Sequence, residues 1–302
     1  MSFQQQLYPS CPVCQNDDIS FALNCKDYSL TQEAFEIIKC NHCSFHFTFP
    51  IPSKDNIAPY YQFPEYISHT DVQEGWMNKL YHKVRQRTLS QKTNWIQSLF
   101  TGHKGNLLEI GAGTGAFANA MTIKGWKVTA LEPDEASRTK ALDNYNLQLF
   151  PIDHLNNLPE NNFDVITLWH VLEHVHDLAG YMEAFTKLLK KNGRLIIAVP
   201  NHTSFDAQFY KQYWAAYDVP RHLYHFSPVA METLCGKYEM RILQFKPMWF
   251  DSFYVSLLSE KYKQTKYIGI LRAFSIGLIS NLFAFRNNKK ASSIIYEIKL
   301  KN

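Results

Sequence analysis

Between residues 105 and 247, short apolar runs alternate with amphipathic stretches. The runs GNLLEI, WKVTAL, LQLF, FDVITLW and GRLIIAVP are typical of buried strands, and helical spacing of apolar residues lies between them over 117–124, 135–145 and 178–190. Such alternation predicts right-handed strand–helix–strand crossovers and a parallel sheet. Two further strands, RILQFKPM and SSIIYEIKL, bring the expected sheet to seven strands, so the predicted class is α/β with helices on both faces.

Two helical segments flank or interrupt this pattern. Apolar residues at helical spacing over about 74–100 predict a helical lead-in, so we expect the α/β domain to occupy residues 71–302, with the lead-in over 71–104. The stretch 254–285 is longer than a connection between two strands requires. Because it contains Arg272 and Asn281, we expect an apolar helix pair and no transmembrane segment. The pair either walls an acceptor pocket or packs on the domain or on a second subunit.

The first seventy residues carry two cysteine pairs. They read CPVC and CNHC and are separated by 25 residues, and a proline-rich stretch follows. Four thiolates satisfy a tetrahedral zinc ion completely, so this spacing predicts a structural zinc module and linker over residues 1–70. A redox dithiol is the alternative for one pair. The predicted zinc ligands are Cys11, Cys14, Cys40 and Cys43, whereas Cys25 and Cys235 lack such spacing and are expected in the core.

Composition and charge narrow the class of protein. With 302 residues, 46% of them hydrophobic, the chain can bury one full α/β core and a small satellite unit. Residues 261–302 hold nine Lys or Arg and one acid, a balance of +8 within a total of +4. This segment suits an anionic partner such as phosphate or lipid headgroups, or it is a solvated basic face. The start, MSFQQQLYPS, does not resemble a secretory signal, which predicts a cytoplasmic protein with reduced thiols.

A glycine-rich segment follows the first strand of the alternating region. Glu109 precedes Gly111, Gly113 and Gly115 at the point where a strand leads into a helix, and there parallel sheets bind nucleotide-like ligands. Glu132 follows at a distance suited to ribose hydroxyls, and the pattern also satisfies the dinucleotide fingerprint. A carboxylate beside the loop would repel a pyrophosphate but attract the ammonium and sulfonium of S-adenosylmethionine. Glu109 therefore favours S-adenosylmethionine over NAD.

Four segments in this order resemble class I S-adenosylmethionine-dependent methyltransferases, in the branch of ubiquinone-type methylases: LLEIGAGTGAF, ALEPDEAS, FDVITLWHVLEHVHD and LLKKNGRLIIAVPN. The resemblance covers about 105–247 and implies a seven-stranded Rossmann-like methyltransferase sheet. It implies that the three glycines line the methionine and ribose portion of the cofactor, that Glu109 neighbours its amino group and that Glu132 binds the ribose. By the same resemblance Asp153 contacts the adenine amino group. A cysteine module ahead of such a domain is similar to certain deoxysugar C-methyltransferases.

The fourth strand ends in Trp169 and His170, at the edge where such sheets bind ligands. Trp169 is expected either to hold the sulfonium through its ring face or to belong to the core. If the following segment is helical, His170, Glu173 and His174 share one face. In ubiquinone-type methylases an acid at the position of His170 is associated, with the next Glu-His pair, with a divalent metal. The departure to His favours residues that orient the cofactor loop over a metal site.

Methyl transfer is an in-line displacement, so the enzyme mainly aligns the acceptor with the sulfonium and excludes water. A general base is needed only when the acceptor starts protonated. The candidate bases are His170, His222 and His225, with His174 beside them. The segment DVPRHLYHFS resembles a lid-and-acceptor segment of related methyltransferases. Arg221 within it would hold an anionic acceptor, or these residues only fix the lid.

Three function classes follow. A methyltransferase acting on a small molecule, such as a sugar nucleotide, a quinol or a lipid-like acceptor, is favoured, and contact with a membrane surface stays open. The alternative is a nucleic-acid methyltransferase that binds through the cysteine module and the basic C-terminal segment. Two observations disfavour this alternative. The fourth strand of this chain ends in LWHVLEH, where amino-methylating DNA enzymes carry an Asn-Pro-Pro-Tyr motif. The chain outside residues 261–302 has a net negative charge, which disfavours a wide contact with phosphates. A non-catalytic binding module would not need the glycine loop with both acids.

Overall fold

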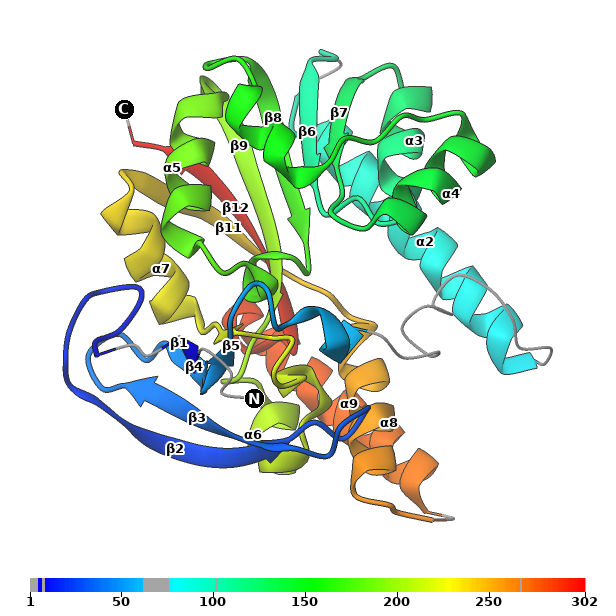
Figure 1. Cartoon of the computed structure of the whole chain (residues 1–302). Helices are drawn as coiled ribbons and strands as arrows, with labels where there is room; N and C mark the ends of the chain where they lie inside the picture. Colours follow the sequence, from blue (N-terminus) through cyan, green and yellow to red (C-terminus); the bar gives the residue numbers. More distant parts are fainter. Residues whose placement is uncertain (1–4, 7–8, 62–75, 101–102, 267, 302) are drawn as a thin grey trace. The chain divides into compact units, whose positions relative to one another are not determined.

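The chain folds around a mixed sheet of six strands, as seen in a computed structural model that describes residues 5–6, 9–61, 76–100, 103–266 and 268–301 (Figure 1). The strand order is β11-β12-β9-β8-β6-β7. β6 lies between β7 and β8 and runs parallel to both, whereas β11 and β12 pair antiparallel. The strands are β6 (Asn106–Ile110), β7 (Lys127–Leu131), β8 (Phe163–Trp169), β9 (Leu189–Pro200), β11 (Met240–Pro247) and β12 (Ser293–Leu300). The predicted α/β class is confirmed.

The prediction of seven strands is wrong by one, because LQLF does not form a strand. Its backbone makes a single parallel bridge, between Phe150 and Leu131. The preceding helix ends at Tyr145, and the next residue, Asn146, has a left-handed conformation, which leaves four residues before Pro151. Proline has no N–H to donate to a neighbouring strand, so the ladder cannot continue past the bridge.

The chain divides into two compact units. The first unit comprises Met1–Tyr66, His170–Ala179 and Ile197–Lys301, and the second comprises Ile67–Trp169 and Gly180–Ile196. The boundary that the sequence predicts near residue 70 lies outside the described residues. The second unit contains α2 (Trp76–Ser98), α3 (Ala116–Ile123), α4 (Glu135–Tyr145), η3 (Ile152–Asn157) and most of α5 (Leu178–Leu188).

The second unit is built on β6 and β8, in which six aliphatic side chains are fully buried: Leu107, Leu108, Ile110, Val165, Ile166 and Leu168. α4 begins where the Asp134 side chain accepts a hydrogen bond from the Ser137 amide at 2.8 Å, which satisfies a free N–H of the first turn. Four alanines in one buried cluster let α3 and α4 approach the sheet closely: Ala112, Ala118, Ala130 and Ala141. This close packing fixes the loop between β6 and α3.

The first unit contains a four-stranded antiparallel sheet in the order β10-β4-β3-β2. Three of its strands come from the cysteine-containing segment and the fourth comes from residues after 220. They are β2 (Ile19–Lys26), β3 (Ala34–Cys40), β4 (His46–Phe49) and β10 (Tyr224–His225). A separate two-stranded sheet pairs β1 (Gln5–Gln6) with β5 (Ile51–Pro52). Because His225 pairs with His46, the N-terminal segment helps to fix the segment that carries the candidate histidines.

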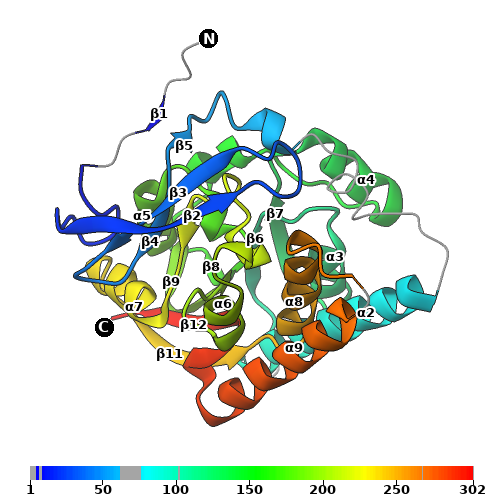
Figure 2. The same cartoon turned by 90° about the horizontal axis from the view of Figure 1, so that it is seen from below.

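Short helices and a helical hairpin complete the first unit. α8 and α9 lie side by side in both views and occupy the stretch that the sequence predicts as an apolar helix pair (Figures 1 and 2). α9 is long and apolar enough to cross a membrane by length and composition alone, and 33% of its residues are buried. The helices are η1 (Ala58–Tyr61), η4 (Leu172–His174), α6 (Phe205–Tyr210), η5 (Lys211–Tyr213), η6 (Ala215–Tyr217), α7 (Pro228–Lys237), α8 (Asp251–Tyr262), α9 (Gly269–Arg286) and η7 (Asn288–Lys290).

Candidate functional site

The loop between β6 and α3 uses glycine for two separate reasons. Gly111, Gly113 and Gly115 all have positive φ, of 69°, 53° and 78°, a region that other L-residues adopt only at a cost. A Cβ on Gly115 would lie 3.0 Å from the Cβ of Ala141, so close helix packing requires glycine there. A Cβ on Gly113 would meet no atom within 4 Å. Gly113 therefore leaves open space beside the loop.

Glu132 holds the glycine loop through its carboxylate. Its Oε2 accepts a hydrogen bond from the Gly113 amide at 2.7 Å, and its Oε1 accepts one from the Asp134 amide at 3.0 Å. Burial raises the pKa of Glu132, and the two amides act in the opposite direction. Each carboxylate oxygen has a second lone pair, so Glu132 can still accept hydroxyl donors from a ligand.

Glu109 is a buried carboxylate in β6, one residue before the end of the strand. It is 2% exposed, and its Oε2 has no hydrogen-bond partner among the described residues. Burial raises the pKa of Glu109 well above its usual value, Lys92 lowers it, and the neighbouring Glu132 raises it further. An orphaned buried carboxylate oxygen is costly unless a cationic ligand pairs with it. Glu109 therefore has the chemistry of an ammonium site.

Lys92, which the sequence pattern does not identify as a site residue, lies at the same place. It comes from α2, and its Nζ lies 4.2 Å from the ring centroid of Trp169, within cation–π distance. The Trp169 ring also meets Phe117 edge to face, with the centroids 5.3 Å apart. The only sequence signal for Lys92 is its place in the helical lead-in, which does not identify the face that it occupies. The Trp169 ring thus faces the ammonium of Lys92, and the contact with a sulfonium stays a prediction.

Asp153 lies in the first turn of η3 and is exposed. Its neighbour His154 stacks on Phe150, with ring centroids 4.5 Å apart. The contact with an adenine amino group expected for Asp153 stays a prediction.

His170 begins the histidine-containing part of the first unit in a strained conformation. Its φ is 58°, and its amide donates to the Ala198 carbonyl at 2.9 Å. Its Nδ1 lies 3.3 Å from Glu173 Oε1 and its Nε2 lies 3.2 Å from Asp251 Oδ2. Burial alone would lower the pKa of His170, but these two carboxylates raise it to about 9. His170 is therefore an imidazolium at neutral pH, held between two acids.

Glu173, His174 and His222 form a compact cluster in which potential ligand atoms of all three lie within 4.8 Å of one another. Nδ1 of His174 lies 3.0 Å from the Arg221 carbonyl, and Nδ1 of His222 lies 2.8 Å from the Ala216 carbonyl. A carbonyl oxygen only accepts, so both Nδ1 atoms carry a proton, and in the neutral form of each ring the lone pair is on Nε2. This arrangement can accept a proton or bind a cation.

Burial and neighbouring charges together set the ionisation of the cluster. Burial and the neighbouring His222 lower the pKa of His174 to about 4, so this imidazole is neutral at pH 7. Glu173 is completely buried, which would raise its pKa, but the three surrounding histidines lower it and keep it ionised. Neither oxygen of Glu173 makes a well-aligned hydrogen bond among the described residues, and the contact with His170 is an ion pair.

His225 is separated from solvent and held by hydrogen bonds. It is 3% exposed, its Nε2 lies 3.0 Å from Thr48 Oγ1, and burial lowers its pKa well below the usual value. The Thr48 hydroxyl donates to the His222 carbonyl at 2.7 Å, so it accepts from His225 Nε2. His225 thus positions the backbone of His222 through Thr48.

Arg221 is bound by carboxylates of its own unit. It is 1% exposed, and its Nη2 lies 2.9 Å from Asp27 Oδ1 and 2.7 Å from Asp218 Oδ1. Burial would lower the pKa of Arg221, but the two acids outweigh burial and raise this pKa above its usual value. Because its guanidinium already meets two negative charges, this geometry favours fixing the lid segment over holding an anionic acceptor.

The four N-terminal cysteines gather into one cluster with ligand atoms within 4.8 Å of one another. Its two halves have the same local geometry. In each, the residue after the second cysteine has positive φ, 62° at Gln15 and 59° at Ser44, and its amide donates to the carbonyl of the first cysteine. The Sγ–Sγ distances are 3.6 Å for Cys11–Cys43 and 3.6 Å for Cys14–Cys40. Cys25 and Cys235 are buried elsewhere, as predicted.

Comparisons with known proteins agree with this geometry. A family model described as a methyltransferase domain matches residues 81–244, more than half of the chain. The chain is 32% identical over 127 residues to the ubiquinone biosynthesis O-methyltransferase of Idiomarina loihiensis, a match that covers 40% of this chain and 51% of that protein. It is 29% identical over 130 residues to the protein of the same name from Photobacterium profundum, covering 41% and 54%. The chain thus spans about half the length of these relatives.

A solved structure shares the fold. The magnesium protoporphyrin IX methyltransferase from Synechocystis PCC 6803, with bound S-adenosylhomocysteine, aligns with a TM-score of 0.54 at 13% identity, covering 82% of this chain and 100% of that chain. At this identity the likeness supports the fold alone.

Proposed function

The chain belongs to the methyltransferase domain family, and on this premise we propose that it transfers the methyl group of S-adenosylmethionine to a small-molecule acceptor. The observation that carries the proposal is the orphaned carboxylate oxygen of Glu109 beside the glycine loop. A dinucleotide would bring a pyrophosphate to this position, where a buried anion repels it. S-adenosylmethionine brings an ammonium, which pairs with it.

The remaining groups of the loop fit the other parts of the cofactor. The amino-acid end of S-adenosylmethionine is zwitterionic, so Glu109 suits its ammonium and Lys92 suits its carboxylate. The open space beside Gly113 admits the ligand backbone, and Glu132 keeps lone pairs for two ribose hydroxyls. Asp153 stays the candidate for the adenine amino group. Each role is assigned by matching the chemistry of a residue to one part of the cofactor.

We further propose that the acceptor atom is a hydroxyl oxygen, because the named relatives are O-methyltransferases. In that reaction the oxygen attacks the methyl carbon, the carbon–sulfur bond breaks, S-adenosylhomocysteine leaves, and the hydroxyl proton must go to a base. His222 supports this step, since its Nδ1 donates to a carbonyl, its Nε2 can accept the proton, and Glu173 beside it stabilises the imidazolium that forms.

This assignment changes the roles expected of two histidines. His170 is already protonated between Glu173 and Asp251, so we assign it to positioning Glu173 and not to accepting a proton. His225 is assigned to positioning His222 through Thr48. Of the three histidines that the sequence proposes as bases, His222 alone keeps that role here.

We propose that the four cysteines hold a structural zinc ion. A zinc–sulfur distance of about 2.3 Å places tetrahedral thiolates about 3.8 Å apart. The observed 3.6 Å pairs fit this geometry closely, and neither pair is joined as a disulfide. Because all four positions would be filled by sulfur, such a zinc would stabilise the module and leave no position for chemistry.

Binding and turnover test the proposal separately. Titration calorimetry should show binding of S-adenosylmethionine and S-adenosylhomocysteine and none of NAD. Binding of NAD alone would overturn the family assignment of the loop. Incubation with a methyl-labelled cofactor and separate pools of quinols, sugar nucleotides, lipids and short DNA or RNA should then transfer label to one small-molecule pool. Label in nucleic acid would favour the alternative function. Addition of a chelator distinguishes a proton-accepting cluster, which keeps its activity, from a metal-binding one.

A further inference from the structure

The α9 helix has its large apolar side chains on the outside. Five of its six buried residues are small, Gly269, Ala273, Gly277, Ser280 and Ala284, and the sixth is Ile276. Its exposed face carries Ile270, Leu271, Phe274, Leu278, Ile279, Leu282, Phe283 and Phe285, with exposures from 36% to 79%. A helix on the surface of a water-exposed domain shows the reverse arrangement. Small residues inward and large apolar residues outward is the arrangement of helices that face lipid.

The inward face of α9 is closely packed, so the exposure of its large apolar side chains does not result from loose packing of the helix. A Cβ on Gly277 would lie 3.1 Å from the Cα of Phe253 in α8, which shows how closely the two helices approach. Ser280 Oγ donates to Asp206 Oδ1 at 2.6 Å, and Arg272 forms a bidentate pair with Glu260 at 2.7 and 2.6 Å. Ser280 and Arg272 are therefore satisfied within the unit, and most of the large apolar side chains of α9 are left outside.

The length of the hairpin decides how it would meet a bilayer. α9, with 18 residues, is about 27 Å long and α8, with 12, about 18 Å, against a hydrocarbon core of about 30 Å. β11 and β12 are paired at Pro247 and Ile294, so the chain leaves and re-enters the sheet at one place. Since α8 is too short to return across a membrane, α9 would lie in the plane of the surface. Trp249, Phe250 and Tyr254, each at least 36% exposed, add aromatic groups suited to that interface.

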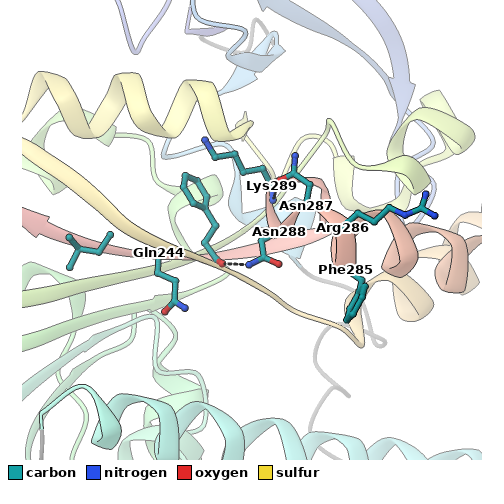
Figure 3. A pocket seen from close by; sticks show the side chains of 8 residues that line it. Gln244, Phe285, Arg286, Asn287, Asn288 and Lys289 are labelled. Atoms are coloured by element: carbon teal, nitrogen blue, oxygen red, sulfur yellow. Dashed lines mark hydrogen bonds between the residues drawn. The ribbon is translucent and has the colours of Figure 1, made fainter.

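Charge indicates which kind of surface the hairpin meets. Residues 261–290 contain seven Lys or Arg and no acid, with three lysines before α9 and three basic residues at and beyond its end. At that end Arg286, Asn287, Asn288 and Lys289 line a shallow groove together with Phe285 (Figure 3). If a second copy of the chain packed on this face with two-fold symmetry, basic ends would meet basic ends. An anionic surface complements both ends at once.

We propose that the α8–α9 hairpin docks this protein onto an anionic lipid bilayer surface, with the outer face of α9 inserted among the headgroups. The hairpin belongs to the first unit and the glycine loop to the second, and docking does not depend on which acceptor is methylated. Membrane binding requires two features, the apolar face of α9 for insertion and the basic residues at its ends for attraction to the anionic surface.

Co-sedimentation with vesicles tests the proposal on the full chain. The wild type should pellet with phosphatidylcholine vesicles that contain roughly 30 mol % phosphatidylglycerol, and much less with phosphatidylcholine alone. Combined Leu271→Gln, Leu278→Gln and Leu282→Gln substitutions should weaken binding about a hundredfold, because each side chain is more than half exposed and would lose its insertion. Combined Lys266→Gln and Lys290→Gln substitutions, at opposite ends of α9, should weaken it roughly thirtyfold.

A matched control keeps the test specific. Ile123, Leu142 and Val229 are 77%, 49% and 53% exposed, and their triple change to Gln should leave vesicle binding unaltered. All variants should keep the wild-type affinity for S-adenosylhomocysteine, which separates this proposal from the proposed function. Failure of the wild type to pellet with anionic vesicles would overturn docking. So would a wild-type dimer, detected by analytical ultracentrifugation, that the leucine triple variant dissociates while vesicle binding is absent.

Discussion

Substitution of Glu109 by Gln should change cofactor affinity and protein stability in opposite directions. The side chain is 2% exposed and its Oε2 lacks a partner among the described residues, so the free protein bears the cost of burying it. A bound ammonium would remove that cost. Gln keeps the shape of the side chain but cannot carry the negative charge.

The sizes of both effects follow from the burial. A hydrogen bond to a charged group contributes about 1.5–3 kcal/mol, so Glu109→Gln should weaken cofactor binding roughly 10–150-fold. Relief of a buried charge should stabilise the free protein by about 1 kcal/mol, a rise in Tm of roughly 2–4 °C. Weaker cofactor binding together with a higher Tm would indicate that the buried charge of Glu109 serves the cofactor and not the fold.

The sign of the pH dependence can be worked out for the same residue. Burial raises the folded-state pKa of Glu109 above its usual 4.5, so its protonated form contributes stability that is fully present below 4.5 and is lost as pH rises through the raised pKa. The stability gained by the variant should therefore grow with pH above 4.5. Wild-type affinity for the cofactor should also increase over that range, because the ammonium binds the ionised carboxylate.

Calorimetry and thermal unfolding measure the two effects. S-adenosylmethionine and S-adenosylhomocysteine share the ammonium, so both should lose affinity equally if Glu109 holds that group. Loss for S-adenosylmethionine alone would mean that Glu109 faces the sulfonium. Glu183→Gln, an exposed change in α5, is the control and should alter neither quantity. Unchanged affinity together with a lowered Tm would refute the reasoning, since Glu109 would then be a structural acid.

Three further predictions concern the other groups. Lys92→Met should weaken binding of both cofactor forms about tenfold if the lysine pairs with their carboxylate, and stronger binding in calorimetry would mean that it only neutralises Glu109. With an identified acceptor, His222→Gln should lower kcat at least about a hundredfold with KM little changed. The loss of kcat should shrink as pH rises, because the acceptor then ionises by itself. A loss that does not depend on pH would indicate a structural role for His222. Cys14→Ser should abolish stoichiometric zinc, measured by mass spectrometry of the metal, and lower the Tm, whereas zinc content equal to wild type would argue against the four-thiolate site.

Much of the sheet could be predicted from local pattern. β6, β7 and β8 lie where the apolar runs predict, whereas β9 begins at Leu189, four residues before the predicted run GRLIIAVP. The exception, LQLF, is apolar enough for a strand but is followed by Pro151. The prediction counted only apolar and polar positions, so it did not take into account that proline has no N–H to donate. The glycine loop was also predictable, because a positive φ at Gly113 and close packing at Gly115 both demand glycine.

The histidine cluster could be predicted only in part. His170, His174 and His222 stand out as titratable residues in suitable segments, but which of them keeps a free lone pair depends on distant partners. The carbonyls of Ala216 and Arg221 fix the tautomers of His222 and His174. For His170 the decisive partner is an acid eighty-one residues further along, at the start of α8. No motif signals such a pairing, because only tertiary structure brings the groups together.

The place of Lys92 suggests why the orphaned charge on Glu109 is tolerated before the cofactor arrives. Lys92 lies over the Trp169 ring and lowers the pKa of Glu109, so a cation is already present in the field of that carboxylate. The lysine sits at 4.2 Å from the ring centroid, the kind of contact that a sulfonium would also make. Since a positively charged cofactor and Lys92 would repel each other at that ring, binding should move the ammonium of Lys92 from the ring toward the cofactor carboxylate. Trp169 fluorescence, sensitive to a cation over the indole, should therefore change on binding in the wild type and change less in Lys92→Met.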